Sequence, residues 1–275
     1  MTHDYSKILA DMVATTREAG ALTLEHFKRF RDLEVGVKGP GDFVSDADRE
    51  SETLIRDQLL SRYPWGLTGE EFAPVDGSNS DHRWLVDPID GTTNFLNGQH
   101  YTITIALRRG NQTICGLIYN PVADEMFTAI KGEGAYLNGE RLHVSASTDV
   151  AMMCVGTGLP TPNLSLHAGA YARLDAIRAP IGAVRIVGSA ANSCAYVACG
   201  RLTGYFEETG FVDTAAGILL VEEAGGVVTD WWGRGPETFE RTGTLIVANK
   251  ATHAFLMGHL NAVPMKNPEA NAPVL

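Results

Sequence analysis

The stretch WLVDPIDGTTNF, at residues 84–95, constrains what this chain can fold into more than any other part of the sequence. It begins as an apolar run, which is typical of a buried β-strand, and then places Asp87 and Asp90 beside Pro88 and Ile89. Burying a carboxylate among apolar side chains is costly unless something cationic meets it, and the stretch contains no Lys or Arg. Whatever neutralises these two aspartates must therefore come from elsewhere.

The spacing of the two aspartates limits how they can act together. Residues three apart in a continuing strand face opposite sides of a sheet. We therefore expect the strand to end at Asp87, Pro88 to turn the chain, and Asp90 to precede a helix that opens at residues 91–93. Two converging carboxylates repel each other unless a cation lies between them, and oxygen ligands at this density suit Mg²⁺, Mn²⁺ or Ca²⁺. The Ile89 carbonyl is a further candidate ligand.

The glycine and threonines after Asp90 predict a site for an anion. A helix N-terminus offers free N–H groups and a partial positive charge, and Gly91 lets the backbone approach a ligand closely. A pair of metal ions beside such a cradle is typical of metal-assisted phosphate hydrolysis. The simpler alternative is that Asp-Pro and Asp-Gly form only turns, which is the commoner role of these dipeptides taken alone.

Other acidic residues lie at the expected ends of helices and strands. Glu70-Glu71 alone is typical of a solvated loop, Asp48 lies in a first helical turn where acids are favourable, and Asp213 alone is explained as a helix N-cap. Each explanation is sufficient by itself, but several acidic clusters at the ends of elements are harder to explain one by one. Together they favour a metal site.

The composition limits the possible classes of function. The chain has 275 residues and a formal net charge of −11, which argues against a broad nucleic-acid surface. An anionic substrate would need local positive charge. No apolar run approaches the roughly 20 residues of a membrane helix, and the first residues lack an apolar signal core, so we expect a cytoplasmic protein. The four cysteines follow no zinc or CxxC spacing and are expected to be reduced.

Periodicity along the chain predicts two layered α/β subdomains. In the first part, helical patterns cover 4–31 and a segment from a Ser45 cap to Tyr63, with Asp48 completing a capping box. Strands are expected just before Gly69, at 83–86, and as an antiparallel meander over 101–108, 113–119 and 125–130. In the second part, helices are expected from Ser189 to Gly200, from Asp213 to 225 and at 251–261, with strands at 227–230 and 244–248.

These elements divide the chain near residue 148. Residues 1–148 are expected to form an N-terminal α+β subdomain with an antiparallel sheet and most of the metal ligands. Residues 149–265 are expected to form a C-terminal α/β subdomain, and residues 266–275, which include Pro, Asn and Ala, a flexible tail.

The motifs resemble those of the inositol monophosphatase family of metal-dependent, lithium-sensitive phosphatases. The resemblance runs from Lys38 to about Asp230, and its anchors are GEE at 69–71, WLVDPIDGTTNF, and DTAAGILLVEEAGG from Asp213. Supporting matches are KGPGDFVSDAD at 38–48 and GSAA at 188–191. The resemblance implies a layered α-β-α-β-α sandwich, usually a homodimer, that hydrolyses a small phosphate monoester with Mg²⁺.

Carried over by position, the resemblance assigns roles to individual residues. It implies Glu70, Asp87 and the Ile89 carbonyl as ligands of one metal ion, and Asp87, Asp90 and Asp213 as ligands of a second. The groups implied to position the attacking water are Glu70, Thr92 and Asp48. The groups implied to bind the substrate are Asp90, Gly91, Thr92, Gly188, Ser189, Ala190, Glu207 and Asp213. Two or three Mg²⁺ ions are implied, with Mn²⁺ as a possible substitute and Li⁺ and Ca²⁺ as inhibitors.

One departure from the family pattern concerns the substrate. The family usually has Trp just before the late aspartate, whereas this chain has Val212 there. The segment from Glu207 to Asp213 is also one residue shorter than is common. We expect the metal site to be kept, and the missing aromatic side chain to widen the substrate pocket or to move Glu207.

Inositol monophosphate is the first substrate candidate, because GTTNF favours that branch of the family. The alternatives on the same scaffold are fructose-1,6-bisphosphatase, 3′-phosphoadenosine-5′-phosphate phosphatase and histidinol-phosphate phosphatase activities. A different class of function is binding to transcription machinery or RNA, which some bacterial relatives perform. A calcium-buffering module fits less well, because the acidic residues are dispersed along the chain and not gathered in one loop.

Overall fold

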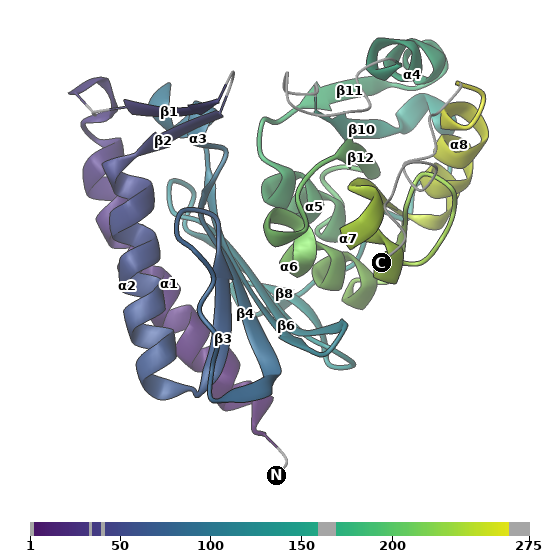
Figure 1. Cartoon of the computed structure of the whole chain (residues 1–275). Helices are drawn as coiled ribbons and strands as arrows, with labels where there is room; N and C mark the ends of the chain where they lie inside the picture. The colour runs from purple at the N-terminus through teal and green to yellow at the C-terminus, as the bar shows by residue number, and fades with distance from the viewer. Residues whose placement is uncertain (1–2, 33–34, 40–41, 159–168, 264–275) are drawn as a thin grey trace, which may run out of the picture.

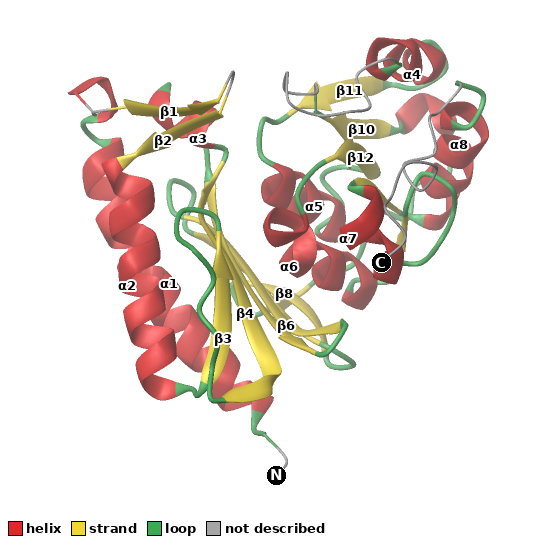
Figure 2. Ribbon diagram, in the orientation of Figure 1, coloured by secondary structure: helices red, strands yellow, loops and turns green. Residues whose placement is uncertain are grey.

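Two large β-sheets and the helices that cover them make up the structure (Figures 1 and 2). The computed structural model describes residues 3–32, 35–39, 42–158 and 169–263. The first large sheet has seven strands in the spatial order β3-β4-β5-β6-β7-β8-β9. Its strands are β3 (Trp65–Gly69), β4 (Asn79–Asp90), β5 (Thr102–Arg109), β6 (Gln112–Asn120), β7 (Glu125–Ile130), β8 (Gly134–Leu137) and β9 (Glu140–Arg141).

Neighbouring strands in this sheet are antiparallel except β3 and β4, which pair in parallel. The predicted meander over 101–108, 113–119 and 125–130 is confirmed by β5, β6 and β7. A short turn joins β5 to β6, and Gly110 adopts a φ of +56° there, in the left-handed region that glycine tolerates best.

Two long helices, α1 (Tyr5–Phe27) and α2 (Asp46–Arg62), cover one face of the seven-stranded sheet (Figure 1). A two-stranded sheet of β1 (Val35–Gly39) and β2 (Asp42–Ser45) leads into α2. The predicted capping box is confirmed, because Asp48 Oδ2 accepts the Ser45 backbone N–H at 2.8 Å. Among the described helices, none combines the length and the apolar character that crossing a membrane requires.

The second large sheet has five strands in the order β11-β10-β12-β14-β13. Its strands are β10 (Cys154–Thr157), β11 (Ala183–Ile186), β12 (Gly204–Glu208), β13 (Val227–Thr229) and β14 (Thr244–Ala248). The helices of this half are α4 (Ala170–Arg178), α5 (Ala190–Ala198), α6 (Phe211–Glu223), α7 (Phe239–Thr242) and α8 (Lys250–Leu260), with α3 (Thr92–Leu96) in the first half. Short 3₁₀ helices lie at Phe30–Asp32, Val150–Met152 and Pro236–Thr238.

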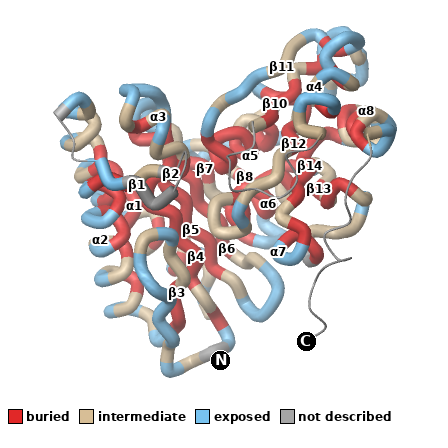
Figure 3. Tube along the Cα trace, turned by 45° about the horizontal axis from the view of Figure 1, so that its top comes forward, coloured by how far each residue is buried: buried red, intermediate tan, exposed pale blue. Residues whose placement is uncertain are grey.

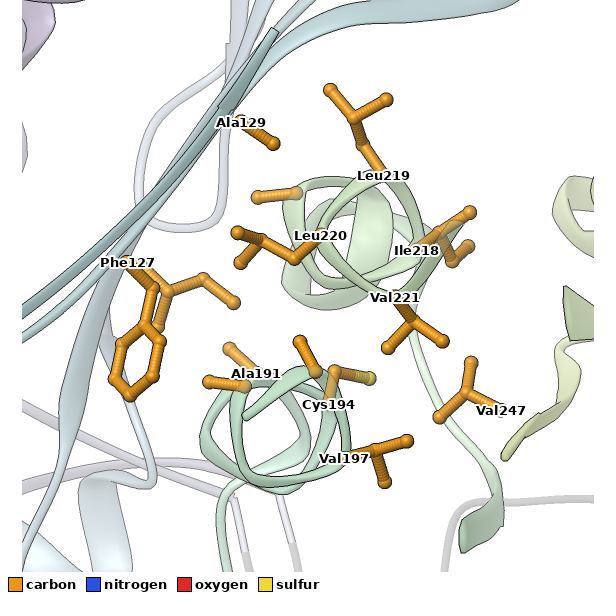
Figure 4. Close-up of a cluster of buried hydrophobic side chains, with 14 of the residues drawn as sticks. Phe127, Ala129, Ala191, Cys194, Val197, Ile218, Leu219, Leu220, Val221 and Val247 are labelled. Carbon is orange, nitrogen blue, oxygen red and sulfur yellow. The ribbon is translucent and has the colours of Figure 1, made fainter. Parts of the chain in front are cut away.

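Helices α5 and α6 form a layer that both large sheets share. Their side chains contact Phe127 and Ala129 of β7 on one side and Val247 of β14 on the other, as Figure 4 shows. Most residues of these two helices are buried, as the red segments in Figure 3 show. Helices α4 and α8 cover the outer face of the five-stranded sheet. The layers therefore run α-β-α-β-α, and the predicted fold class is confirmed.

The strands of the seven-stranded sheet end at Arg141, and those of the five-stranded sheet begin at Cys154. The division into subdomains 1–148 and 149–265 stays a proposal, because the shared α5–α6 layer packs on both sheets. The predicted tail at 266–275 lies outside the described residues.

Three predicted element boundaries were wrong. The helix expected over 4–31 ends at Phe27, and Phe30–Asp32 form a separate 3₁₀ helix. Strand β4 does not end at Asp87 but continues to Asp90, because an irregularity in its pairing with β5 lets the ladder resume there. Helix α6 begins at Phe211 and not at Asp213, so Asp213 lies in the first turn and Gly210 is the N-cap. The helix starts earlier because Phe211 and Val212 pack against the shared core.

We expect Gly217→Ala to destabilise the protein by about 1–3 kcal/mol, since overpacking a dense core costs this much. A Cβ atom added at Gly217 in α6 would lie 2.4 Å from Cβ of Cys194 in α5. Gly258→Ala in α8 is the matched control, because nothing lies within 4 Å of its added Cβ atom. That variant should be neutral or gain up to about 1 kcal/mol from helix propensity. Urea unfolding of both variants tests the difference, and equal stabilities would contradict it.

Candidate active site

A β-bulge brings the two aspartates of the central motif to one side of the sheet. Asp87 pairs with Thr104 of β5, and Asp90 pairs with Thr102. Strand β4 therefore advances three residues while β5 advances two, and the extra residue removes the alternation that would otherwise separate the aspartates. The Ile89 N–H donates to Asp87 Oδ1 at 2.9 Å and closes this irregular turn. Both aspartates are buried, with 2% and 8% of their surface exposed.

The parallel pairing of β3 with β4 carries Glu70 to the same place. Gly69 pairs with Val86, so Glu70 follows beside Asp87. Burial raises the pKa of Asp87 most, the charge of Glu70 comes next, and a hydrogen bond between the two carboxyls adds to the shift. The loop after Gly69 is held by Glu52, a buried residue of α2 whose Oε2 accepts the Glu71 N–H at 2.7 Å. Glu52 is itself paired with Arg56 at 2.9 Å. The sequence prediction missed Glu52, although it shares one helix face with Asp48, Ile55 and Leu59.

Asp90 is satisfied by the N-terminus of α5. Its carboxylate accepts the backbone N–H groups of Ala190 at 3.2 Å and Ala191 at 2.8 Å, and the hydroxyls of Ser189 and, at 3.2 Å, Thr102. The Ser189 hydroxyl also accepts the Asn192 N–H, so the predicted cap of α5 is confirmed. The partial positive charge of a helix N-terminus favours a carboxylate at this position.

Asp213 reaches the site from α6, in the second half of the chain. It is partly buried in the first turn of the helix, and Oδ2 accepts the Thr209 hydroxyl at 3.4 Å. Burial, and after it the negative charges of Asp90 and Glu70, raise the pKa of Asp213 to about 7, while the Thr209 hydrogen bond opposes the shift. Because the charges of Asp90 and Glu70, from the first half of the chain, affect its pKa, Asp213 lies at the junction of the two halves.

The carboxylates destabilise one another in their charged forms. Burial raises the pKa of Asp87 well above its usual value, and Glu70, Asp213 and Asp90 add to the shift in that order. None of these leading influences is a positive charge. Burial also raises the pKa of Asp90, although its four hydrogen bonds oppose the shift. A cation among these oxygens would therefore stabilise the charged forms of the carboxylates.

The donor set fits a hard divalent cation, since it consists of carboxylate oxygens and a backbone carbonyl. Among the described residues, no group of three or more His, Cys, Asp or Glu side chains is arranged, as it stands, to hold a metal ion. The Asp90 carboxylate faces the donors of α5, and the Ile89 carbonyl accepts the Thr92 hydroxyl at 3.2 Å. The ligand roles of Glu70, Asp87, Ile89, Asp90 and Asp213 stay a prediction.

Thr92 at the start of α3 and Asp48 in the first turn of α2 lie within hydrogen-bond distance of each other. The Thr92 hydroxyl lies 3.4 Å from Oδ1 of Asp48, and it can donate either there or to Ile89. Asp48 is fully buried, and its other oxygen is held by Ser45 through both the backbone N–H and the hydroxyl. A threonine hydroxyl that donates to a fixed acceptor can also accept a hydrogen bond through its oxygen.

Two glycines of the predicted substrate-binding set, one from each half of the chain, lie close together. Gly91 caps α3 with a φ of +94°, and a Cβ atom there would lie 2.9 Å from the Gly188 carbonyl oxygen. Gly188 has a φ of +73°, and a Cβ atom there would lie 2.7 Å from Oδ1 of Asn94. The Asn94 amide donates to Val187 at 2.8 Å and thus ties α3 to the loop before α5. Sequence analysis missed this role of Asn94, which lies inside the central motif.

Glu207 lies at the end of β12, and the Tyr205 hydroxyl donates to its Oε2. Burial raises the pKa of Glu207 to about 7, opposed by this hydrogen bond and aided by the charge of Asp90. Val212, at the position of the expected tryptophan, is partly buried against the shared core. The substrate-binding roles of Gly188, Ser189, Ala190 and Glu207 stay predictions.

The four cysteines of the sequence are free thiols, and Cys115 and Cys194 are buried, as expected. Burial raises the pKa of both thiols. They therefore act as small apolar side chains and not as metal ligands or nucleophiles.

Comparison with known proteins agrees with this geometry. Residues 4–265 match the model of the inositol monophosphatase family. An inositol-1-monophosphatase of Mesorhizobium japonicum is 40% identical over 256 residues, which are 92% of this chain and 95% of that protein. The Nus factor SuhB of Pasteurella multocida is 36% identical over 239 residues, which are 86% of this chain and 89% of that protein.

Among solved structures, the extragenic suppressor protein suhB of Bartonella henselae matches with a TM-score of 0.88 and 38% identity. The match covers 92% of this chain and 98% of that one. With the layered fold, the carboxylates at the junction of its halves and these similarities over nearly the whole chain, the protein belongs to the inositol monophosphatase family and is a phosphatase.

Proposed function

We propose that this phosphatase hydrolyses inositol monophosphate, a small phosphate monoester, with Mg²⁺. The observation that carries the proposal is the convergence of Asp87, Asp90 and Asp213 from two halves of an acidic chain, with their pKa values raised by burial and by one another. Such an arrangement is unfavourable in a protein built for stability alone, and a bound divalent cation removes the cost.

The residues proposed to hold Mg²⁺ are those implied by the family resemblance. Glu70, Asp87 and the Ile89 carbonyl would hold one ion, and Asp87, Asp90 and Asp213 a second. When bound, Mg²⁺ supplies the positive charge that the site lacks and lowers the pKa of a coordinated water. The protein's part is to deliver the oxygens, and the β4 bulge, the β3–β4 register and the first turn of α6 do this.

Thr92, Asp48 and Glu70 are proposed to position the attacking water. Asp48 is fixed by Ser45 and would accept the Thr92 hydroxyl, so that the hydroxyl oxygen is left to accept a hydrogen bond from the water. Glu70 borders the same space beside Asp87 and offers an acceptor for the second hydrogen of the water. This pair of acceptors selects one orientation of the nucleophile, which is the entropic part of catalysis.

The ester is proposed to lie between Gly91–Thr92 and the loop before α5. The missing side chain of Gly91 lets the loop before α5 approach closely, since an added Cβ atom would lie 2.9 Å from the Gly188 carbonyl oxygen. On the other side, Gly188, Ser189, Ala190 and Glu207 would contact the alcohol part. Because Glu207 is held by Tyr205 and Val212 is smaller than tryptophan, the alcohol pocket is also compatible with the sister sugar and nucleotide phosphatase activities.

The relatives named Nus factor SuhB favour a second role. One of them is 36% identical to this chain over most of both chains. We therefore retain binding to transcription machinery as a second candidate function, and a homodimer as the assembly implied by the family. An inactive site variant separates the roles, because a binding role survives the loss of turnover.

The proposed function predicts Mg²⁺-dependent phosphate release from inositol 1-phosphate, inhibited by lithium. A panel of this ester with fructose 1,6-bisphosphate, 3′-phosphoadenosine 5′-phosphate and histidinol phosphate measures the preference through kcat/KM. Inositol 1-phosphate should give the highest value. A higher value for another ester would replace the proposed substrate, and no release from any ester would overturn the proposal.

Asp87→Asn should lower Mg²⁺-dependent kcat/KM by more than about a hundredfold, because even the outer partners of metal ligands change affinity or activity by about 10–100-fold. The fold should survive, since the change removes mutual repulsion among buried carboxylates. Asp57→Asn, an exposed position on α2, is the matched control and should keep full activity. Near-normal turnover by Asp87→Asn would contradict the metal assignment.

The metal-free protein should lose stability as the pH rises. The pKa of Asp213 is about 7 in the folded state and 3.8 in a free side chain, so between these values the folded state holds a proton that the unfolded state has lost. The free energy of unfolding therefore falls as pH increases over this window. Asp213→Asn cannot ionise there. In EDTA, its Tm should exceed that of the wild type by several degrees more at pH 7.5 than at pH 5.

Mg²⁺ at pH 7.5 should raise the Tm of the wild type and raise that of Asp213→Asn less, because a cation stabilises only the charged carboxylate. An equal difference in Tm between the two proteins at both pH values would show that Asp213 does not carry the raised pKa.

A further inference from the structure

Arg108 of β5 faces the helical layer that both halves of the chain share. Side chains alternate along a strand, so Thr104, Ala106 and Arg108 lie on one face of β5. Thr104 pairs with Asp87 of the candidate active site, and Ala106 packs in the shared core. Arg108 therefore lies on the face of the sheet that carries the proposed metal ligands, farther along the same strand.

The Arg108 guanidinium contacts two residues of the second half of the chain. Its Cζ lies 4.7 Å from the ring centre of Phe211, the first residue of α6, and its Nη1 donates to Oε1 of Glu240 in α7. A guanidinium stacks on an aromatic face without using its N–H donors, so one arginine can hold the ring and the carboxylate together. The Arg108 side chain is only 13% exposed, so solvent screens these contacts less than at an open surface.

Stability alone does not explain an arginine at this position. Its Nε is buried and has no hydrogen-bond partner among the residues that the structure describes. A buried donor that stays unmatched costs free energy, which offsets part of what the ion pair contributes. The contacts of Arg108 are therefore better explained by what they hold in place.

The Phe211 ring depends on these contacts, because its other packing is incomplete. The ring is only partly buried against the shared core, and its centre lies 5.7 Å from that of Phe239 in α7. It also borders a pocket between β6 and α6 that Gln112, Thr113 and Ile218 line. A pocket supplies no packing atoms on its side of a ring. Arg108 and Phe239 therefore restrain Phe211 where the core does not.

Phe211 belongs to the same first turn of α6 as Asp213, the proposed ligand from the second half. Gly210 is the N-cap of this turn, and the Thr209 hydroxyl donates to Asp213 Oδ2 at 3.4 Å. The Thr209 N–H donates at 2.8 Å to the carbonyl of Gly243, the C-cap of α7. Backbone hydrogen bonds fix the dihedrals of a helical turn, so a shift of Phe211 also shifts Asp213.

Val212 makes this route specific to the present chain. The position before the late aspartate, where the family usually has tryptophan, holds a valine that packs against the shared core. A valine offers no aromatic face to a cation. In the turn formed by residues 211–214, the ring of Phe211 is therefore the one group that Arg108 can stack on.

We propose that Arg108 is a positioning residue that holds the first turn of α6, and with it Asp213, through the Phe211 ring. The inference rests on the proposed function, in which Asp213 is a Mg²⁺ ligand, and it adds to that site a residue from the opposite half of the chain. Arg108 itself would contact neither the metal ion nor the ester. Its loss would let the turn shift and would weaken Mg²⁺ binding.

The test measures the Kd for Mg²⁺ from the rise of Tm with Mg²⁺ concentration, without substrate. Arg108→Met should raise this Kd by about tenfold, the lower end of the range for groups that position metal ligands. Removing a positive charge by itself favours the binding of a cation, so a weaker affinity has the opposite sign to the direct effect of the charge. Turnover of inositol 1-phosphate should then need more Mg²⁺ and recover as Mg²⁺ is raised.

A double-mutant cycle tests whether Arg108 acts through the ring. Phe211→Leu should raise the Kd for Mg²⁺ by a similar factor. The variant that carries both changes should bind Mg²⁺ no more weakly than the weaker single variant, because each change removes the same contact. A Kd raised by the product of the two single effects would contradict the route through Phe211.

The matched control is Arg109→Met, which removes the same charge from the next residue of β5, an exposed position on the other face. It should not raise the Kd. Arg108→Lys keeps a cation near the ring without the planar donors, so it should raise the Kd by a smaller factor than Arg108→Met. If Arg108→Met does not fold, Glu240→Gln removes only the ion pair from its exposed side and should raise the Kd in the same direction.

Asp213→Asn separates this inference from the proposed function, because it should raise the Kd for Mg²⁺ by itself. If it does, and Arg108→Met lowers Tm equally at every Mg²⁺ concentration with an unchanged Kd, Arg108 has only a structural role and the inference is wrong. If Asp213→Asn leaves the Kd unchanged, the proposed metal assignment fails, and the inference fails with it.

Discussion

The hydrogen bonds from the first turn of α5 to Asp90 are the interaction on which the rest of this structure depends. Asp90 belongs to the seven-stranded sheet, whereas α5 belongs to the layer shared with the five-stranded sheet. A buried carboxylate is tolerated only where donors or a cation meet it, and a helix N-terminus supplies both free N–H groups and partial positive charge. The two halves are therefore joined at the place where the chemistry is proposed.

Close packing of the shared layer makes this junction rigid. Gly217 of α6 lies against Cys194 of α5, and Gly116 of β6 lies so close to α6 that an added Cβ atom would be 3.0 Å from the Ala216 carbonyl oxygen. A dense interior of this kind has few alternative arrangements. Both helices can therefore present their first turns, which carry Ala190 and Asp213, to the same side of the seven-stranded sheet.

The site is less stable electrostatically than the fold around it. Burial and mutual repulsion raise the pKa values of Asp87, Asp90 and Asp213, and the leading influences include no positive charge. Arg173 of α4 is a second departure, because this guanidinium is buried and its Nε and Nη1 atoms have no hydrogen-bond partner among the described residues. Proteins break rules of polar satisfaction mainly at functional sites, where a ligand supplies what the chain lacks.

The sequence alone determined the local features of this protein, because caps, turns and strand patterns depend on residues a few positions apart. It predicted the capping box at Ser45, the meander of the first sheet, the cap of α5 at Ser189 and the family motifs. Only the tertiary structure decided that a bulge aligns Asp87 with Asp90, that Glu52 holds the loop after Gly69, and that Arg173 is buried with open donors. These properties follow from strand register and from burial by distant residues, and neither is encoded in any single segment.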